Sequence, residues 1–185
     1  MNQREPSPTE LLKHARFLRR EALTCGKAGA YLAAALMAGA AMEAVLLATV
    51  LESTEQGVRE AGWWPRSGDK GGLVRASPRR WSLANLIDCA WLAGWLDAFE
   101  IDEIDLENEA QVLRGLRNLV AHPLLYVSDP MTPYVFDRRE FRDVMVRLKL
   151  VFDATAVARK DRAVPPPVAP RETVIGSTSR RRGER

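Results

Sequence analysis

The sequence predicts an all-α protein, an antiparallel bundle of four or five helices. Apolar residues recur at three- and four-residue steps along five stretches, which is the period of an amphipathic helix. Capping residues precede three of those stretches. The chain has 185 residues, of which 46% are hydrophobic, so it can form one core and one domain, over residues 1–158. We expect no β-sheet, and helices near residues 7–24, 27–54, 82–98, 105–121 and 137–158.

The first helix begins with a capping signal. Ser7 stands at the N-cap, Pro8 at the first helical position and Glu10 three residues after the serine, which is the spacing of a capping box. The apolar positions that follow form a buried stripe of Leu11, Leu12, Ala15, Leu18 and Ala22. His14 lies off this stripe, so we interpret it as a surface residue.

The second helix, 27–54, is long enough to span a bilayer, which needs about 20 apolar residues. It is rich in Ala and Gly, however, and small residues allow neighbouring helices to approach closely in a bundle. It also contains Glu43, and a carboxylate at the middle of a membrane costs about 2.5–3.5 kcal/mol. We therefore favour a core helix and no membrane span. Glu43 then lies either on an exposed side or beside a cation such as Arg114 or Arg117.

The segment from Glu55 to Arg80 is rich in Gly, Pro and Ser and predicts a long loop. Its candidate RNA-binding residues are the cations Arg66, Lys70, Arg75, Arg79 and Arg80. Trp63, Trp64 and Trp81 are near them in sequence, and cations beside aromatic rings suit single-stranded nucleic acid. In the alternative interpretation the tryptophans pack back into the bundle and the cations are solvated.

Capping residues also mark two later helices. The third helix has two candidate N-caps, Ser77 and Ser82, and is heavily apolar. The fifth starts with the cap pair Asp137 and Glu140. Its apolar stripe consists of Phe141, Val144, Met145, Leu148, Val151, Phe152 and Thr155.

The C-terminal segment, 159–185, differs in composition from the domain. It has eight Lys or Arg and three Asp or Glu, so its charge balance is +5 while that of residues 1–158 is −2. Its Pro run, Arg cluster and low hydrophobicity predict a disordered tail. Cys25 and Cys89 are the only cysteines, and two unclustered thiols indicate a reducing compartment. Because the N-terminus lacks a signal-peptide pattern, the predicted location is the cytoplasm.

The fourth helix, 105–121, gathers the candidate catalytic residues at its end. Its apolar face consists of Leu106, Ala110, Leu113, Leu116 and Val120. Arg117, Asn118 and His122 lie at the last turn, and the helix stops at Pro123. Asn118 and His122 are four residues apart and therefore share one face.

The run Arg117-Asn118-Leu119-Val120-Ala121-His122 resembles the RNxxxH signature of the HEPN superfamily, the higher eukaryotes and prokaryotes nucleotide-binding domains. The resemblance implies a helical bundle, RNA as the substrate, a homodimer that brings two motifs together and, in toxin systems, a partner antitoxin protein. Some members have a tyrosine two residues after the histidine, whereas this chain has Leu124 there and its nearest tyrosine is Tyr126. We count Glu43, Arg114 and Tyr126 as candidate supporting residues.

These residues could cleave RNA without a metal or a cofactor. His122 can take the proton from a ribose 2′-hydroxyl or give one to the leaving 5′-oxygen. Arg117 can hold the scissile phosphate, and Asn118 can orient the imidazole. The sequence contains neither a metal-ligand cluster nor a phosphate-binding glycine loop. It therefore predicts a metal-independent endoribonuclease, and the alternative is a non-catalytic helical module that binds a partner protein or a nucleotide.

Overall fold

The computed structural model describes residues 5–67, 72–96, 110–111, 113–115 and 137–161. Its elements are α1 (Pro8–Lys27), α2 (Tyr31–Glu52), α3 (Glu55–Glu60), β1 (Arg66–Ser67), β2 (Gly72–Leu73), the 3-10 turn η2 (Pro78–Arg80), α4 (Leu83–Leu92) and α7 (Arg138–Asp161). Residues 110–111 and 113–115 are also helical. The predicted all-α class is confirmed, because the strands in the described part of the chain are one antiparallel pair of two residues each.

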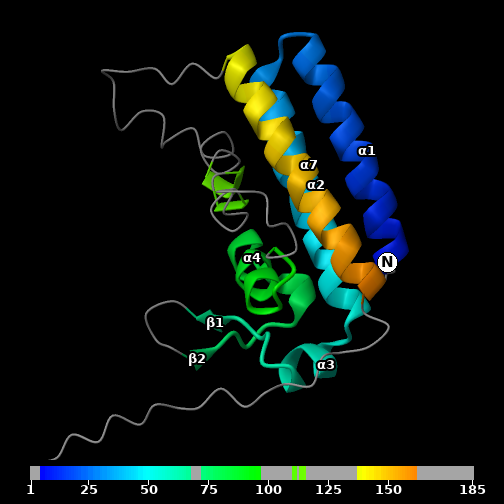
Figure 1. Cartoon of the computed structure of the whole chain (residues 1–185), viewed down its shortest axis with the longest axis vertical. Coiled ribbons are helices and arrows are strands. Elements are labelled where there is room, and N and C mark those ends of the chain that lie inside the picture. The colour runs from blue at the N-terminus through cyan, green and yellow to red at the C-terminus, as the bar shows by residue number, and fades with distance from the viewer. Residues whose placement is uncertain (1–4, 68–71, 97–109, 112, 116–136, 162–185) are drawn as a thin grey trace, which may run out of the picture.

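The three long helices, α1, α2 and α7, lie side by side (Figure 1). α1 and α2 are antiparallel, as their short connection requires, but α7 runs in the same direction as α2. At the starts of these two helices the rings of Tyr31 and Phe141 have centroids 5.8 Å apart, and at their ends Arg159 lies 3.9 Å from Glu52. The expectation of an antiparallel bundle is therefore wrong for this pair. The connection between α2 and α7 is long, so it does not impose a direction on α7.

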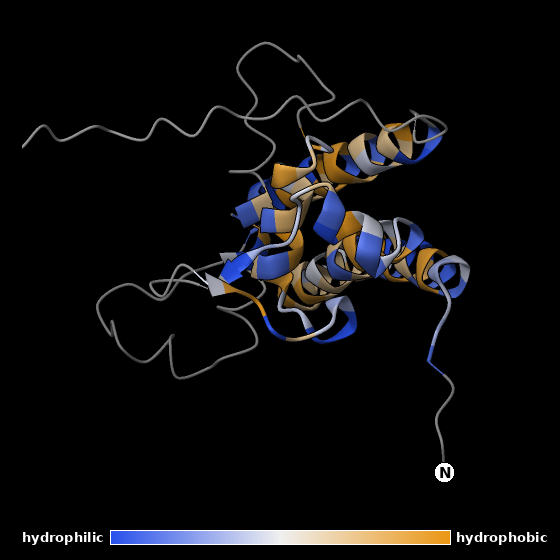
Figure 2. Cartoon of the chain, turned by 90° about the horizontal axis from the view of Figure 1, so that it is seen from below, coloured by the Kyte–Doolittle hydropathy of each residue, from blue (hydrophilic) through white to orange (hydrophobic). Residues whose placement is uncertain are grey.

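α2 is the central helix and packs against α1, α4 and α7. Most of its buried residues are small, and they include Ala34, Ala35, Ala38, Gly39, Ala41, Ala44 and Ala48. This helix is long and apolar enough to cross a membrane, and 67% of its most apolar 18-residue window is buried inside the structure. Figure 2 shows hydrophobic residues turned toward the space between the helices and hydrophilic ones turned outward. Burial of this extent is what a core helix requires.

Three N-terminal caps confirm predicted helix starts. The Ser7 hydroxyl accepts a hydrogen bond from the Glu10 N–H at 3.3 Å, and the Glu10 carboxylate accepts one from the Ser7 N–H at 2.7 Å. The Asp137 carboxylate accepts from two N–H groups in the first turn of α7, at 2.7 and 3.0 Å. Ser82 caps α4, whereas Ser77 precedes η2. Each of the two candidate serines thus begins an element of its own.

Two helix boundaries differ from the prediction because a glycine stands in the left-handed conformation. Gly29, with φ of +78°, separates α1 from α2, so α2 begins at Tyr31 and not at 27. Gly94, with φ of +67°, follows α4, which ends at Leu92 and not at 98. Two backbone hydrogen bonds of 2.9 and 3.0 Å close a Schellman motif there. α7 continues past the predicted end at 158 to Asp161.

The segment 55–80, predicted to be a long loop, contains regular structure. It includes α3, the two strands and η2, and in the strand pair Arg66 lies opposite Leu73. The Gly and Pro residues that suggest a loop stand at element boundaries, where Gly62 follows α3 and Pro78 opens η2. These residues therefore mark real breaks in the chain, but short elements occupy the stretches between the breaks.

Candidate functional site

The predicted catalytic residues Arg117, Asn118 and His122 lie outside the described residues. The same holds for the supporting residue Tyr126 and for Lys70 of the candidate RNA-binding group. The predicted site residues that the structure does describe are Glu43, Arg114, Arg66, Arg75, Arg79 and Arg80. The described residues nearest to the motif in sequence are the helical residues 110–111 and 113–115.

The chain just before the motif is helical and packed into the core. Ala110 and Leu113, both from the predicted apolar face, are 0% and 2% exposed and belong to the main hydrophobic cluster. Gly115 is exposed, and Arg114, which precedes it, is half-buried. The buried residues of this turn are thus the two that the three- and four-residue spacing predicts.

Asp88 of α4 and Arg114 influence each other electrostatically. Burial raises the pKa of the Asp88 carboxyl, and the positive charge of Arg114 acts in the opposite direction. The Nε atom of Arg114 is buried, and it has no hydrogen-bond partner among the residues that the structure describes. Asp88 was not predicted as a site residue, although a carboxylate between Ile87 and Cys89, both fully buried, is a signal that the sequence carries.

Glu43 is half-buried on α2, between the buried residues Met42 and Ala44. The side chain is thus neither fully solvated nor fully buried, and its exposure fits both the exposed position and the pairing with a cation that the sequence left open. Its pairing with Arg114 or Arg117 stays a prediction.

Among the described cations of the 55–80 segment, Arg79 has partners within the protein and the other candidate residues are exposed. Arg79 lies 2.8 Å from Glu5 and donates a hydrogen bond of 2.9 Å to the Pro6 carbonyl, so it fastens the start of the described chain to η2. Arg66, Arg75 and Arg80 are exposed. These three could contact a phosphate, whereas Arg79 would first have to leave its partner.

The tryptophans near these cations pack inside the fold. Trp64 and Trp81 are buried with ring centroids 4.7 Å apart in an edge-to-face arrangement. Their indole N–H groups donate to the carbonyls of Val74 at 2.6 Å and Ala76 at 2.8 Å. Trp63 packs edge-on against Trp95 at 5.7 Å. The interpretation in which these rings pack into the bundle therefore fits the structure, and the faces of Trp64 and Trp81 are not available for stacking with bases.

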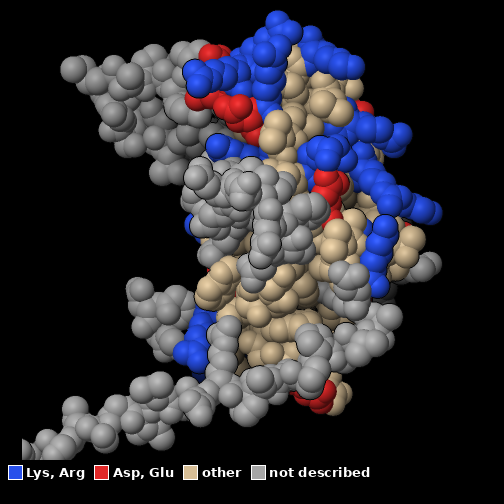
Figure 3. Space-filling view, viewed as in Figure 1, with Lys and Arg blue, Asp and Glu red and all other residues tan. Residues whose placement is uncertain are grey.

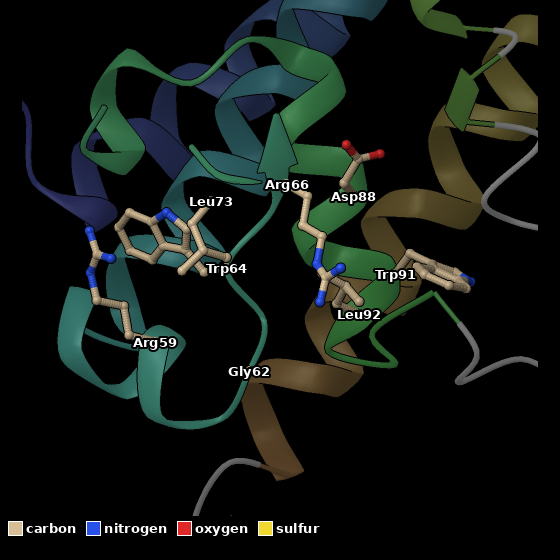
Figure 4. Close-up of a pocket in the computed structure, with 8 residues that line it drawn as sticks. All are labelled: Arg59, Gly62, Trp64, Arg66, Leu73, Asp88, Trp91 and Leu92. Carbon is tan, nitrogen blue, oxygen red and sulfur yellow. The ribbon is translucent and has the colours of Figure 1, made fainter. Parts of the chain in front are cut away.

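A cavity of about 580 Å³ lies between the strand pair and α4 (Figure 4). Its lining residues are Arg59, Gly62, Trp64, Arg66, Leu73, Asp88, Trp91 and Leu92. The Arg59 guanidinium covers the Trp64 ring at 3.5 Å and pairs with Glu55, also at 3.5 Å. Arg66 extends toward Leu92 on the other side, and Trp91 is 48% exposed. The cavity thus offers the guanidinium of Arg66, the half-buried carboxyl of Asp88 and the exposed ring of Trp91. Its second guanidinium, that of Arg59, already contacts Trp64 and Glu55.

Neither a metal centre nor a relative identifies this site. Among the residues that the structure describes, no group of three or more His, Cys, Asp or Glu side chains is placed to hold a metal ion. Comparison with known protein families, curated proteins and solved structures finds no significant match.

Proposed function

We propose that the protein is a metal-independent endoribonuclease of the HEPN type, with Arg117, Asn118 and His122 as its catalytic residues. A toxin, phage-defence or RNA-processing role fits this activity, and an antitoxin protein is the partner expected in the first case. The proposal includes a cytoplasmic location and a domain that ends with α7 at Asp161, three residues past the predicted boundary at 158, before the rest of the basic tail.

The observation that carries the proposal is the position of the RNxxxH run directly after a turn anchored in the core. Ala110 and Leu113 fix that turn against the bundle through their buried side chains. A catalytic group is effective only when rigid neighbours hold it, because a misplacement of about 1 Å can cost roughly 100-fold in rate. The all-α architecture of the described chain also agrees with the expected HEPN bundle.

In the proposed reaction, the 2′-oxygen of a ribose attacks the adjacent phosphorus as its proton passes to a His122 imidazole. The bond from phosphorus to the 5′-oxygen breaks, and that oxygen receives a proton. The products are a 2′,3′-cyclic phosphate and a 5′-hydroxyl. Arg117 binds the phosphate oxygens on which negative charge increases, and Asn118 orients the imidazole or the substrate.

The two proton transfers favour a homodimer. A single imidazole serves poorly as base and acid in the same step, whereas two copies of His122 facing each other could divide these roles. A symmetric dimer with this motif at its two-fold axis would bring both copies together. Sedimentation at micromolar concentration should give the dimer mass, and a monomer would argue against the composite site.

The test is cleavage of labelled RNA in the presence of EDTA. His122→Ala should lower the cleavage rate by roughly 10²–10⁴-fold with the fold retained, and Arg117→Ala should have a comparable effect. Arg117→Lys should recover little, because lysine lacks the bidentate guanidinium fork. His14→Ala is the matched control, since His14 is the chain's other histidine and is exposed on α1.

Equal cleavage by the wild type and His122→Ala would refute the assignment to this motif. Loss of activity in EDTA would refute the metal-independent mechanism. Deletion of residues 161–185 separates the tail from the chemistry, because it should weaken RNA binding and its salt dependence without abolishing turnover.

A second candidate function, a non-catalytic module that binds a nucleotide, is favoured by the cavity beside α4. The half-exposed Trp91 ring can stack on a base, and Arg66 can bind a phosphate. Calorimetric titration with nucleoside monophosphates tests this candidate. Binding that Arg66→Ala and Trp91→Ala both weaken, in a protein that leaves RNA intact, would support it over the ribonuclease.

A further inference from the structure

We propose that the outer face of α1 is an RNA-binding surface, where a row of cations and an arginine-lined hollow receive successive phosphates. Lys13, Arg16, Arg20 and Lys27 are all exposed on this face. Their spacing places them within about 60° of one another around an ideal helix. The buried residues Ala15, Leu18, Ala22 and Gly26 occupy the opposite side. The four cations thus form one straight row along the helix, the α1 basic row.

The row is not neutralised by neighbouring acids. Among the described residues, none of its four side chains has an ion-pair partner. Of the two acidic residues of the helix, Glu10 is a neighbour of Lys13, about 60° round from it, and Glu21 lies about 80° round; both stand on the side away from the other three cations of the row. Figure 3 shows Lys and Arg side chains gathered along the side of the molecule where α1 lies. Like charges one turn apart repel each other, so an anion bound between them is favoured.

The hollow is the part of this face that is built to hold an anion. It has a volume of about 350 Å³ and is lined by Arg16, Arg19, Arg20 and Leu23. The Arg19 guanidinium lies over the Phe152 ring of α7, 5.5 Å from its centroid, so a contact between helices restrains this side chain. Its Nε atom is buried and, within the described part of the chain, lacks a hydrogen-bond partner. Three guanidinium groups beside one hollow, one of them held in place, suit the oxygens of a phosphate.

The length of the row indicates a polymer and not one small anion. Lys13 and Lys27 are about 21 Å apart along the helix at ~1.5 Å per residue. One strand of a duplex presents a phosphate per ~3.4 Å of axis, which sets an upper limit of roughly six phosphates for the row, since the phosphates of an extended single strand are further apart. The choice of RNA among polyanions rests on the proposed function, whereas the anion-binding character of the face does not.

The experiment measures the affinity of the full-length His122→Ala variant for a fluorescent single-stranded RNA, so that binding is observed without cleavage. On this background Arg16→Gln with Arg20→Gln should weaken binding at least 10-fold at 0.1 M salt. The slope of log affinity against log salt should fall by about 1.4, or ~0.7 for each phosphate that the protein no longer neutralises. Arg19→Met retains an unbranched side chain over Phe152 without the charge and should weaken binding by itself. The matched control is Arg138→Gln with Lys160→Gln, which removes the same charge from exposed positions of α7.

Wild-type affinity in the Arg16 and Arg20 variant would overturn the proposal. An equal loss in the α7 control would do so too, because net charge alone would then explain binding. Preferential binding of the row to phosphatidylserine vesicles, with no RNA binding, would reassign the face to a membrane surface. RNA binding that depends on the row in a wild type that cleaves no RNA would retain this proposal and refute the ribonuclease.

Discussion

The α1–α2 pair and the segment from Val58 to Leu96 contribute to one core with opposite kinds of side chain. Alanines and glycines dominate the buried positions of α2, so the backbones of neighbouring helices can approach closely. The later segment instead buries Trp64, Trp81 and Trp95, each 5% exposed or less. The first region surrounds its larger buried residues, such as Met42 and Leu46, with small ones, whereas the second fills its space with a few large rings.

This difference determines which substitutions each region tolerates. A close helix contact has no room for added atoms, so enlarging a residue there forces neighbours apart. In a region held by tryptophans, removal of one ring leaves a cavity and an unpaired carbonyl. Substitutions that enlarge a side chain should therefore destabilise the first region most, and substitutions that truncate a side chain should destabilise the second region most.

The largest effect should come from Trp64→Ala. The ring is 3% exposed, donates its N–H to the Val74 carbonyl at 2.6 Å and lies beneath the Arg59 guanidinium. We expect the free energy of unfolding to fall by about 3–5 kcal/mol in denaturant titrations. Trp91→Ala is the control and should cost about 1 kcal/mol or less, because that ring is 48% exposed. Equal losses in the two variants would contradict the assigned roles.

Gly26→Ala should test the close contact. A Cβ atom at Gly26 would lie 2.1 Å from Cζ of the buried Phe141 ring, so the ring must move. Overpacking of this kind costs about 1–3 kcal/mol and outweighs the gain of up to ~1 kcal/mol in helix propensity. Gly115→Ala is the matched control, since a Cβ there meets nothing within 4 Å, and it should stabilise the protein by about 0.5–1 kcal/mol. Stabilisation by both substitutions would show that α1 and α7 have room between them.

Thr54, at the junction of the two regions, should respond less strongly. It combines φ of +59° and ψ of 151° with a side-chain hydrogen bond of 3.1 Å from the Gly57 N–H. Glycine relieves the strain and is a fair N-cap, whereas alanine keeps the strain and loses the cap. Thr54→Gly should therefore be more stable than Thr54→Ala by about 1–2 kcal/mol in thermal unfolding. The reverse order would show that the backbone here is relaxed.

The smallest effect should appear in the pH dependence of stability. Because the pKa of Asp88 is raised in the fold, its protonated form contributes stability that is present at low pH and is lost as pH rises through that pKa. The Asp88→Asn variant has no carboxyl to ionise, so it does not lose this stability. Its free energy of unfolding relative to that of the wild type should therefore increase between acidic and neutral pH. An opposite trend would mean that attraction to Arg114 outweighs burial. Asp153→Asn, at the surface ion pair with Lys149, is the control.

Features set by nearby residues were predictable from the sequence, and features set by distant ones were not. The caps at Ser7, Ser82 and Asp137 depend on three or four consecutive residues and were predicted correctly. The direction of α7, the Trp64–Trp81 pair and the influence of Arg114 on Asp88 depend on residues far apart in the chain. The left-handed glycines were visible in the sequence, but their effect on helix length was underestimated.

The central position of α2 has a consequence during synthesis. Roughly 85 residues separate the end of α2 from the start of α7, which corresponds to about 4–17 s of translation at ~5–20 residues per second. α1 precedes α2 and can pack against it as soon as both have been synthesised. The side of α2 that α7 covers stays uncovered until α7 has been translated. A 22-residue apolar helix with one uncovered side is then exposed on the ribosome to chaperones, to other nascent chains and to membrane-insertion machinery. The rate at which the intervening segment is translated should therefore govern how much of the protein escapes aggregation.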